Sequence, residues 1–179
     1  MKKLCMILTL FLNLNFMISC QDKETLAELE AFKVHTDMIA KNKEAVRYML
    51  EETDKMNYAA WDEVCSPDYV ARFAGMNEPM NLEQHKEANR LSYLAFPDFK
   101  HEINDIVAEA DRAFFYVTLT GTHEGEFMGI PPTDKKIKYT AIVWVRFAEG
   151  KIIEAYGVMD MLSLMQQLGM ELKPKAKEK

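Results

Sequence analysis

The segment Gly121–Lys136 separates two apolar stretches, 113–120 and 137–147, that are rich in β-branched and aromatic residues. Glycines stand at 121, 125 and 129 of this segment, and Pro131 and Pro132 follow them. Glycine weakens a strand, and proline lacks the backbone donor that a sheet ladder needs. The segment therefore cannot continue a regular sheet. We expect a long loop of defined shape that connects two paired strands.

The N-terminal residues have the pattern of a secretory signal peptide. Lys2 and Lys3 precede an apolar run from 4 to 18, which is shorter than the ~20 apolar residues of a membrane span. The tetrapeptide Met17–Cys20 resembles a bacterial lipobox, which implies cleavage before Cys20 and lipidation of its thiol. We expect a lipid anchor in the cell envelope, on a periplasmic or cell-surface face, and more than one acyl chain would make it stable. The alternative is an ordinary secreted protein in which Cys20 has no role.

Charge and cysteine content exclude several classes of partner and chemistry. Without Lys2 and Lys3, 20 basic and 28 acidic side chains give a net charge of −8, which argues against nucleic acid and anionic lipid surfaces. Once Cys20 carries lipid and the signal peptide is removed, Cys65 is alone and forms no internal disulfide. A lone cysteine of this kind is more often a small buried hydrophobe than a nucleophile.

The periodicity of apolar residues predicts helices first and strands afterwards. Helical spacing runs from Asp22 to Asp54, with a short helix at 58–64 and a third at 82–94 behind the N-cap residue Asn81. Strands are expected at 67–73, 100–108, 113–123, 137–147 and 151–159, and a closing helix at 161–168 between Asp160 and Gly169. This order is an α+β layout in which a curved antiparallel sheet packs on N-terminal helices and encloses a cavity.

The chain is predicted to have four parts. They are a lipoprotein-type signal peptide (1–19), a helical spacer (20–41), one globular domain (42–170) and a charged tail (171–179). A domain of this length can bury a substantial core.

The loop and its flanks carry a family resemblance. Gly121-Thr-His-Glu-Gly-Glu-Phe-Met-Gly-Ile-Pro-Pro-Thr133 and Phe147-Ala-Glu-Gly-Lys-Ile-Ile-Glu154 resemble the signature of SnoaL-like polyketide (ester) cyclases. That family has similar short motifs at the positions of two further segments, Ala95-Phe-Pro-Asp-Phe99 and Gln166-Gln-Leu-Gly169. The resemblance covers roughly 42–170 and implies the cone-shaped fold of nuclear transport factor 2. Fold alone does not imply the cyclase reaction.

The resemblance also implies where catalytic residues would stand. Aligned through Gly150-Lys-Ile152, the acid–base aspartate of the namesake cyclases falls at Gly157, and the histidine facing it falls at Val143. Neither residue can remove a proton next to a carbonyl group. Alternation along the last two strands predicts inward faces of Tyr139, Ala141, Val143 and Val145, and of Ile153, Ala155, Gly157 and Met159. These faces offer no carboxylate and no imidazole.

Other residues are candidates for a displaced acid–base pair. His123, at the end of a strand, and Asp160 are the catalytic candidates, although a turn brace and a helix cap are their structural alternatives. His85, on the third helix, is a candidate for the cavity, whereas His101 and His35 are expected at the surface. The histidines are scattered without metal-ligand spacing, and no cofactor motif is present, so we expect neither metal nor cofactor.

Aromatic and sulfur-containing side chains suit a cavity for a small, largely apolar molecule. The expected ligand-binding residues are Tyr48, Trp61, Tyr69, His85, Tyr139, Val143 and Gly157. Three functions remain open: a lipoprotein that binds such a ligand without cyclase chemistry, an active cyclase, isomerase or lyase, and a dimeric interaction module. The outer sheet face, with Trp144, Tyr156 and Val158, is apolar enough for a homodimer interface.

Overall fold

The structure is a computed structural model that describes the backbone of residues 2–171 and 173, and side chains from residue 23 onward. The chain divides into two compact units, residues 1–38 and 39–179. The side chains of the predicted signal peptide, the Cys20 side chain, and most of the predicted charged tail lie outside the described residues. Among the helices searched, all within the described residues, none is both long and apolar enough to cross a membrane.

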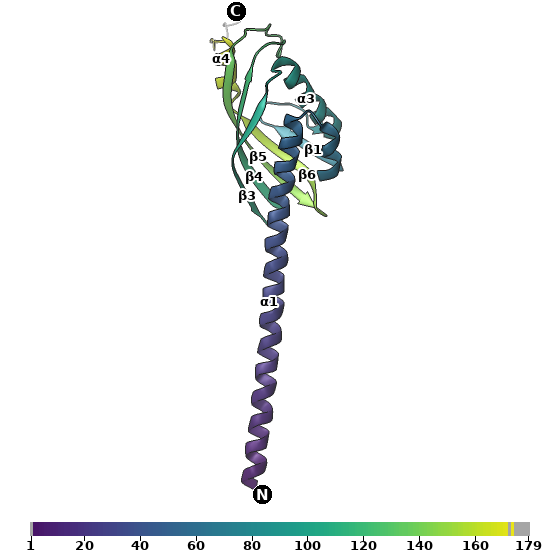
Figure 1. The fold of residues 1–179 in the computed structure, drawn as a ribbon, viewed down its shortest axis with the longest axis vertical. Helices are drawn as coiled ribbons and strands as arrows, with labels where there is room; N and C mark the ends of the chain where they lie inside the picture. Colours follow the sequence, from purple (N-terminus) through teal and green to yellow (C-terminus); the bar gives the residue numbers. More distant parts are fainter. Residues whose placement is uncertain (1, 172, 174–179) are drawn as a thin grey trace, which may run out of the picture. The chain divides into compact units, whose positions relative to one another are not determined.

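The predicted helices are present (Figure 1), but the first begins at Lys2 instead of near Asp22, and the short helix at 58–64 is divided into two elements. Helix α1 is Lys2–Asp54, η1 is Tyr58–Ala60, α2 is Trp61–Val64, α3 is Leu82–Ala95 and α4 is Met161–Leu168. Asn81 caps α3 in a capping box with Gln84: its side chain accepts from the Gln84 amide, and Gln84 accepts from the Asn81 amide. Asp160 caps α4, and Gly169 ends it with φ of 101°.

Six strands form one sheet in the order β2-β1-β6-β5-β4-β3. Their bounds are β1 Cys65–Phe73, β2 Met80–Asn81, β3 Lys100–Glu109, β4 Arg112–Thr122, β5 Lys136–Ala148 and β6 Lys151–Met159. The meander from β3 to β6 is antiparallel, as predicted. Strand β1 instead pairs with β6 in parallel, and β2 was not predicted because it has only two residues. The fold class is α+β, with helices packed against a curved sheet.

The predicted inward face of β5 is confirmed, because Tyr139, Ala141, Val143 and Val145 are all buried. On β6 the prediction is wrong at one position: Ile152, not Ile153, is fully buried. The register shifts between Arg146 and Phe147, so Ile153 is an extra residue in the ladder. Such a bulge reverses the side-chain alternation and bends the strand.

One face of the C-terminal part of α1 packs into the core. Val46, Met49 and Leu50 are buried there, and Thr53 continues the same face one turn later. Their spacing is that of one helical stripe. Asn42, at the start of the stripe, is also buried and donates a hydrogen bond to the carbonyl oxygen of Ala110 (3.1 Å).

The glycine- and proline-rich segment is a loop between the paired strands β4 and β5, as predicted. Its backbone is tied to the end of α3, because the amides of Glu124 and Gly125 both donate to the carbonyl oxygen of Ala95 (3.0 Å each). A β-carbon at position 125 would lie 2.2 Å from the carbonyl oxygen of Leu94. Only glycine allows so close an approach of the two backbones.

Candidate functional site

A cavity of about 1090 Å³ lies between the helices and the inner face of the sheet. Its wall comes from α1, α2, α3, the inward positions of β1 and β3–β6, and the loop after β4. Methionine, aliphatic and aromatic side chains form most of this wall. Four of the predicted ligand-binding residues with polar groups line it: Trp61, Tyr69, His85 and Tyr139.

The two strand positions singled out by the family resemblance face each other. Val143 on β5 pairs directly with Gly157 on β6, and Val143 lines the cavity. Gly157 is covered by the ring of Phe73, whose atoms would lie 2.3 and 2.5 Å from a β-carbon at that position. The Phe73 ring therefore occupies the volume beside Gly157 into which a longer side chain would otherwise extend.

An imidazole enters the cavity from helix α3. His85 packs against three aromatic rings: edge-on to Trp61 and Phe73, and stacked on Tyr69, with centroid distances of 4.9, 5.1 and 5.9 Å. Its Nδ1 lies 2.8 Å from the Tyr69 hydroxyl oxygen. Burial lowers the pKa of His85 to about 4 and raises the pKa of the Tyr69 phenol. Both groups are therefore neutral near pH 7.

The proton positions in this pair follow from the acidities of the two groups. A phenol is a stronger hydrogen-bond donor than a neutral imidazole, so we assign the shared proton to Tyr69, with Nδ1 as acceptor. The His85 proton then resides on Nε2, which has no hydrogen-bond partner among the described residues. His85 thus offers the cavity a neutral donor, suited to a carbonyl or other acceptor.

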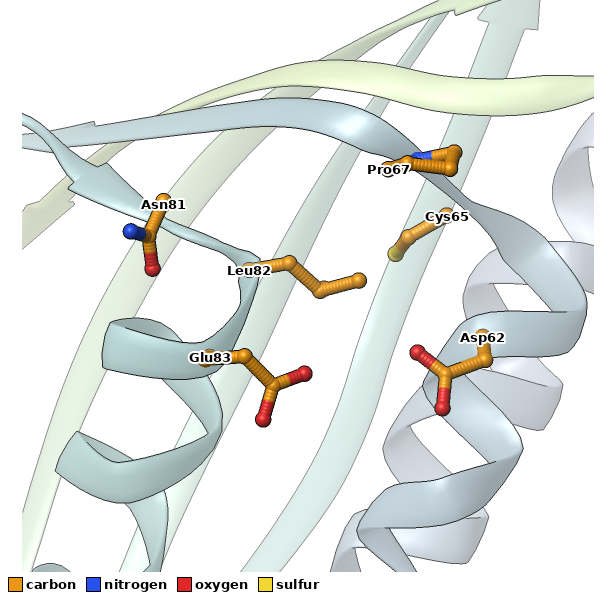
Figure 2. Close-up of a pocket in the computed structure, with 6 residues that line it drawn as sticks. All are labelled: Asp62, Cys65, Pro67, Asn81, Leu82 and Glu83. Atoms are coloured by element: carbon orange, nitrogen blue, oxygen red, sulfur yellow. The ribbon is translucent and has the colours of Figure 1, made fainter.

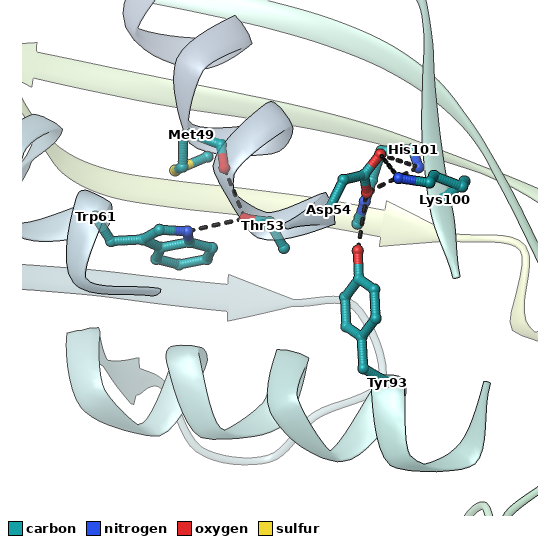
Figure 3. A network of polar contacts seen from close by, with 7 residues as sticks. All are labelled: Met49, Thr53, Asp54, Trp61, Tyr93, Lys100 and His101. Atoms are coloured by element: carbon teal, nitrogen blue, oxygen red, sulfur yellow. Dashed lines mark hydrogen bonds and ion pairs between the residues drawn. The ribbon is translucent and has the colours of Figure 1, made fainter. Parts of the chain in front are cut away.

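A hydrogen-bonded chain holds Trp61 in the wall (Figure 3). The Trp61 indole nitrogen donates to the Thr53 hydroxyl (2.8 Å), which donates to the Met49 carbonyl oxygen in the last turns of α1 (2.6 Å). Both Trp61 and Thr53 are almost fully buried. The indole donor is satisfied internally, so Trp61 presents only its ring to a ligand.

A second polar network lies at the end of α1 (Figure 3). Asp54 accepts hydrogen bonds from the Tyr93 hydroxyl (2.8 Å), from the His101 backbone amide (3.2 Å) and from His101 Nδ1 (2.7 Å). Burial acts to raise the pKa of Asp54, but the hydrogen bonds from His101 and Tyr93 outweigh it and lower the pKa. Lys100 Nζ lies 3.7 Å from the same carboxylate and is mostly exposed. Asp54 is therefore ionised near neutral pH.

The expectation that His101 is a surface residue is wrong. Its side chain is 9% exposed, lines the cavity, and packs edge-on to Phe99 at 5.3 Å. His101 pairs with the buried Leu119 across β3 and β4, which places it on the inward face of the sheet. The cavity therefore contains two imidazoles, His85 and His101, although neither comes from the last two strands.

Tyr139 adds a phenol to the polar groups of the cavity. Its hydroxyl has no hydrogen-bond partner within the part of the chain that the structure describes, and burial raises its pKa. Tyr48 lies elsewhere: its hydroxyl donates to Glu63 (3.0 Å), and its side chain is not part of the cavity wall.

The two predicted catalytic residues lie outside the cavity wall. His123 is fully buried in the loop after β4, where Nδ1 lies 3.0 Å from the Thr133 hydroxyl and the backbone bonds to Asp134 and Lys135. Asp160 is exposed and accepts from the Ser163 amide (3.0 Å) as the cap of α4. The structure brings neither residue to Tyr139, His85 or His101.

Comparison with known proteins identifies the family of this chain. The sequence profile of the SnoaL-like polyketide cyclases matches residues 43–168. The chain belongs to this family. No curated protein matches it.

Among solved structures, this SnoaL-like domain is similar to AclR from Streptomyces galilaeus, a proposed hydroxylase, with 29% identity and a TM-score of 0.67 over 73% of this chain and 97% of AclR. It is similar to IdmH from Streptomyces antibioticus, a proposed polyketide cyclase, with 25% identity and a TM-score of 0.66 over 72% and 98% of the two chains. A SnoaL-like protein from Jannaschia sp. CCS1 shares the fold at 22% identity and a TM-score of 0.69, over 75% and 96% of the two chains.

The SnoaL-like domain has a second, smaller hollow of about 350 Å³ between α2, β1 and α3 (Figure 2). Asp62 and Glu83 face each other across it. Lys86 Nζ forms an ion pair with each carboxylate, at 2.6 and 2.8 Å. Cys65 lies at its floor, where burial raises the pKa of the thiol to about 12. A neutral thiol is a poor nucleophile, so Cys65 is not activated for nucleophilic attack near neutral pH. Among the described residues, no cluster of side chains could hold a metal ion.

Sequence reasoning missed Asp54 and His101 as site residues. Asp54 and His101 are 47 positions apart, and their contact depends on how α1 packs on β3. The sequence signal that could have found His101 was the alternation of side chains along β3, which places His101 and Ile103 on the same, inward side of the strand. A histidine on that side is expected to point into the domain.

Proposed function

We propose that this SnoaL-like domain binds a small, largely apolar molecule in its cavity. The observation that supports this most strongly is the cavity itself, whose volume of about 1090 Å³ matches or exceeds that of typical ligand sites. Its wall is mostly hydrocarbon, sulfur and aromatic ring, with a minority of polar groups that include Tyr139, His85, His101 and Tyr69. That composition suits an apolar ring system with one or two acceptor groups.

The family supplies a ligand class for the first test. Polyketide cyclases act on polyketides, and aromatic polyketides are flat, apolar molecules edged with carbonyl and hydroxyl groups. A neutral donor at His85 Nε2 and the hydroxyl of Tyr139 would match such edges. We propose that binding takes place without the acid–base residues of the namesake enzymes, because Gly157 and Val143 stand at the positions that the resemblance assigns to them.

The test is titration of the protein with 1,8-dihydroxyanthraquinone, an aromatic polyketide nucleus. Trp61 lines the cavity and Trp144 lies on the outer sheet face, so the Trp144→Phe variant reports the cavity alone. We expect quenching of Trp61 fluorescence with a Kd on the order of 100 µM or tighter. In the same background, Ala141→Phe would fill the cavity and abolish quenching, whereas Tyr156→Phe on the outer face would not. Quenching that survives Ala141→Phe would contradict the proposal.

We also propose that the outer sheet face mediates a homodimer. Phe114, Trp144 and Tyr156 are neighbours across β4, β5 and β6, and Ile142 and Val158 form the next row. Four of these side chains are exposed, and Ile142 is 57% exposed. A contiguous apolar patch of this kind favours association. The same fold would then serve as a binding domain and as an interaction module.

Anchoring to the membrane is a third proposal, and it rests on the sequence of residues 17–20. Cys20 would be the lipidated residue, placing the domain at the cell envelope. Metabolic labelling with an alkyne-tagged fatty acid tests this: the wild type should be labelled and the Cys20→Ser variant should not. Equal labelling of both variants would contradict a lipid anchor at Cys20.

A further inference from the structure

Asp54 fixes the protonation of one of the two imidazoles in the cavity. A carboxylate only accepts hydrogen bonds, so the 2.7 Å contact between Asp54 Oδ1 and His101 Nδ1 requires a proton on Nδ1. In the neutral ring, Nε2 then carries a lone pair and no proton. Nε2 has no hydrogen-bond partner among the described residues, and the ring lines the cavity. His101 therefore presents a base, whereas His85 presents a donor.

The surroundings hold this arrangement in place. Asp54 is 14% exposed and is fixed by two further donors, the Tyr93 hydroxyl and the His101 backbone amide. Phe99 packs against the edge of the His101 ring. An ionised carboxylate behind an oriented imidazole stabilises the imidazolium that forms when the ring accepts a proton. Lys100 is the one further charged group at this carboxylate among the described residues, and it lies 3.7 Å away.

We propose that His101, oriented by Asp54, is a general base that removes a proton from a carbon acid bound in the cavity. The substrate class is an apolar molecule with an acidic C–H bond next to a carbonyl or similar group. The C–H bond breaks as the Nε2–H bond forms, and the electron pair moves to the carbonyl oxygen to give an enolate. The proton held by His101 then returns to the same or another carbon. This inference rests on the proposed binding of an apolar ligand and adds a reaction to it.

A probe of known chemistry tests the base without knowledge of the natural substrate. In 5-nitrobenzisoxazole, a base removes the ring C–H proton while the N–O bond breaks, giving a nitrile and a coloured phenolate. The wild type is expected to accelerate this elimination above buffer, with saturation by the probe. His101→Gln should lose at least about tenfold in kcat, because positioned bases contribute about 10²–10⁴-fold. Glu102→Gln, at an exposed outward position of the same strand, is the matched control and should retain the rate.

Asp54 is a positioning residue, and its test needs a spectroscopic readout. With ¹⁵N-labelled histidine, the NMR spectrum of the wild type should show His101 as the tautomer protonated at Nδ1. Asp54→Asn should lose this preference and lower kcat while binding is retained. If His101→Gln or Asp54→Asn does not fold, the tautomer of the wild-type ring still decides: a neutral ring protonated at Nε2 overturns the proposal.

Binding is measured separately, so that the two proposals can fail independently. 5-Nitroindazole has the same ring frame without the cleavable N–O bond, and its binding is followed by quenching of Trp61. Binding together with His101-dependent elimination supports the proposed dyad, which consists of the base His101 and the positioning residue Asp54. Binding with no elimination, or with elimination unchanged in His101→Gln, overturns the dyad and leaves the binding function standing. Absence of binding by both 5-nitroindazole and the anthraquinone overturns both proposals.

Discussion

The ring of Phe73 lies against the Cα of Gly157, its neighbour across the parallel pair of strands β1 and β6. A β-carbon at position 157 would be 2.3 Å from Cε1 and 2.5 Å from Cδ1 of that ring, well inside contact distance. The same ring contacts His85 edge-on. Phe73 thus contacts both Gly157 on β6 and the His85 imidazole on α3. A larger residue at position 157 would displace the Phe73 ring and so disturb the packing of His85.

Gly157→Ala is expected to destabilise the domain by about 1–3 kcal/mol, because the added methyl group overpacks against Phe73. Phe73 is partly buried, and truncation to alanine removes the clash. The double variant Gly157→Ala/Phe73→Ala should therefore be more stable than the sum of the single effects predicts. Urea unfolding of the four proteins measures this coupling. Additive effects would mean that Phe73 does not limit the size of residue 157.

Gly125 and Gly129 provide a matched pair in the loop after β4. A β-carbon at 125 would lie 2.2 Å from the Leu94 carbonyl oxygen, and neither backbone can move without breaking the bonds to Ala95. At Gly129 φ is +80° and no atom lies within 4 Å, so alanine there meets only backbone strain. We expect Gly129→Ala to cost about 1 kcal/mol and Gly125→Ala clearly more. Equal unfolding free energies of the two variants would argue against the close backbone contact between Gly125 and the end of α3.

The regular elements could be predicted because local patterns define them. Asn81 before α3, and Asp160 and Gly169 around α4, act within a few residues of their own positions. The glycines and prolines of the loop exclude strand locally in the same way. The bulge at Ile153 could not be predicted, since it depends on how β6 pairs with β5 and the residue itself is an ordinary strand former.

The polar part of the cavity was harder to predict than its apolar wall. Trp61, Tyr69 and Tyr139 are large and partly apolar, and burial is their default in a domain of this size. A histidine has no comparable tendency to be buried, so the sequence predicts a surface position for His101. Its true position is set by Asp54, which comes from another element. Contacts of this kind follow from tertiary packing and leave little trace in a single sequence.

His85 should make stability dependent on pH below neutrality. Its pKa in the fold is about 4, whereas an unfolded histidine titrates near 6.5. As pH falls below about 6.5, the unfolded chain takes up a proton that the folded protein does not, so stability is lost progressively down to about pH 4. Between pH 7 and pH 5 this group alone should cost about 1–2 kcal/mol in unfolding free energy. His85→Gln should show a correspondingly smaller loss, and an equal loss would contradict burial of a neutral His85.

Cys65 should act in the opposite pH range. Burial raises the pKa of its thiol to about 12 in the fold, against about 9 for an ordinary thiol. Above pH 9 the unfolded state gains stability by losing a proton, so the folded state loses up to about 1.4 kcal/mol per pH unit until about pH 12. Cys65→Ala should flatten that part of the profile. At pH 8 the native thiol should also react with an aromatic disulfide reagent far more slowly than the urea-unfolded thiol does.

The proposed dimer gives the last prediction. Ile142 lies in the middle of the outer face, between Tyr116 and Val158 in the adjacent strands. Ile142→Glu would place a charge within an apolar interface and is expected to convert a dimer to a monomer, as measured by light scattering coupled to size exclusion. Leu162→Glu is the control, because Leu162 is an exposed apolar residue on α4, outside the sheet. A wild type that is monomeric at 100 µM, or a dimer that persists in Ile142→Glu, would exclude this face as the interface.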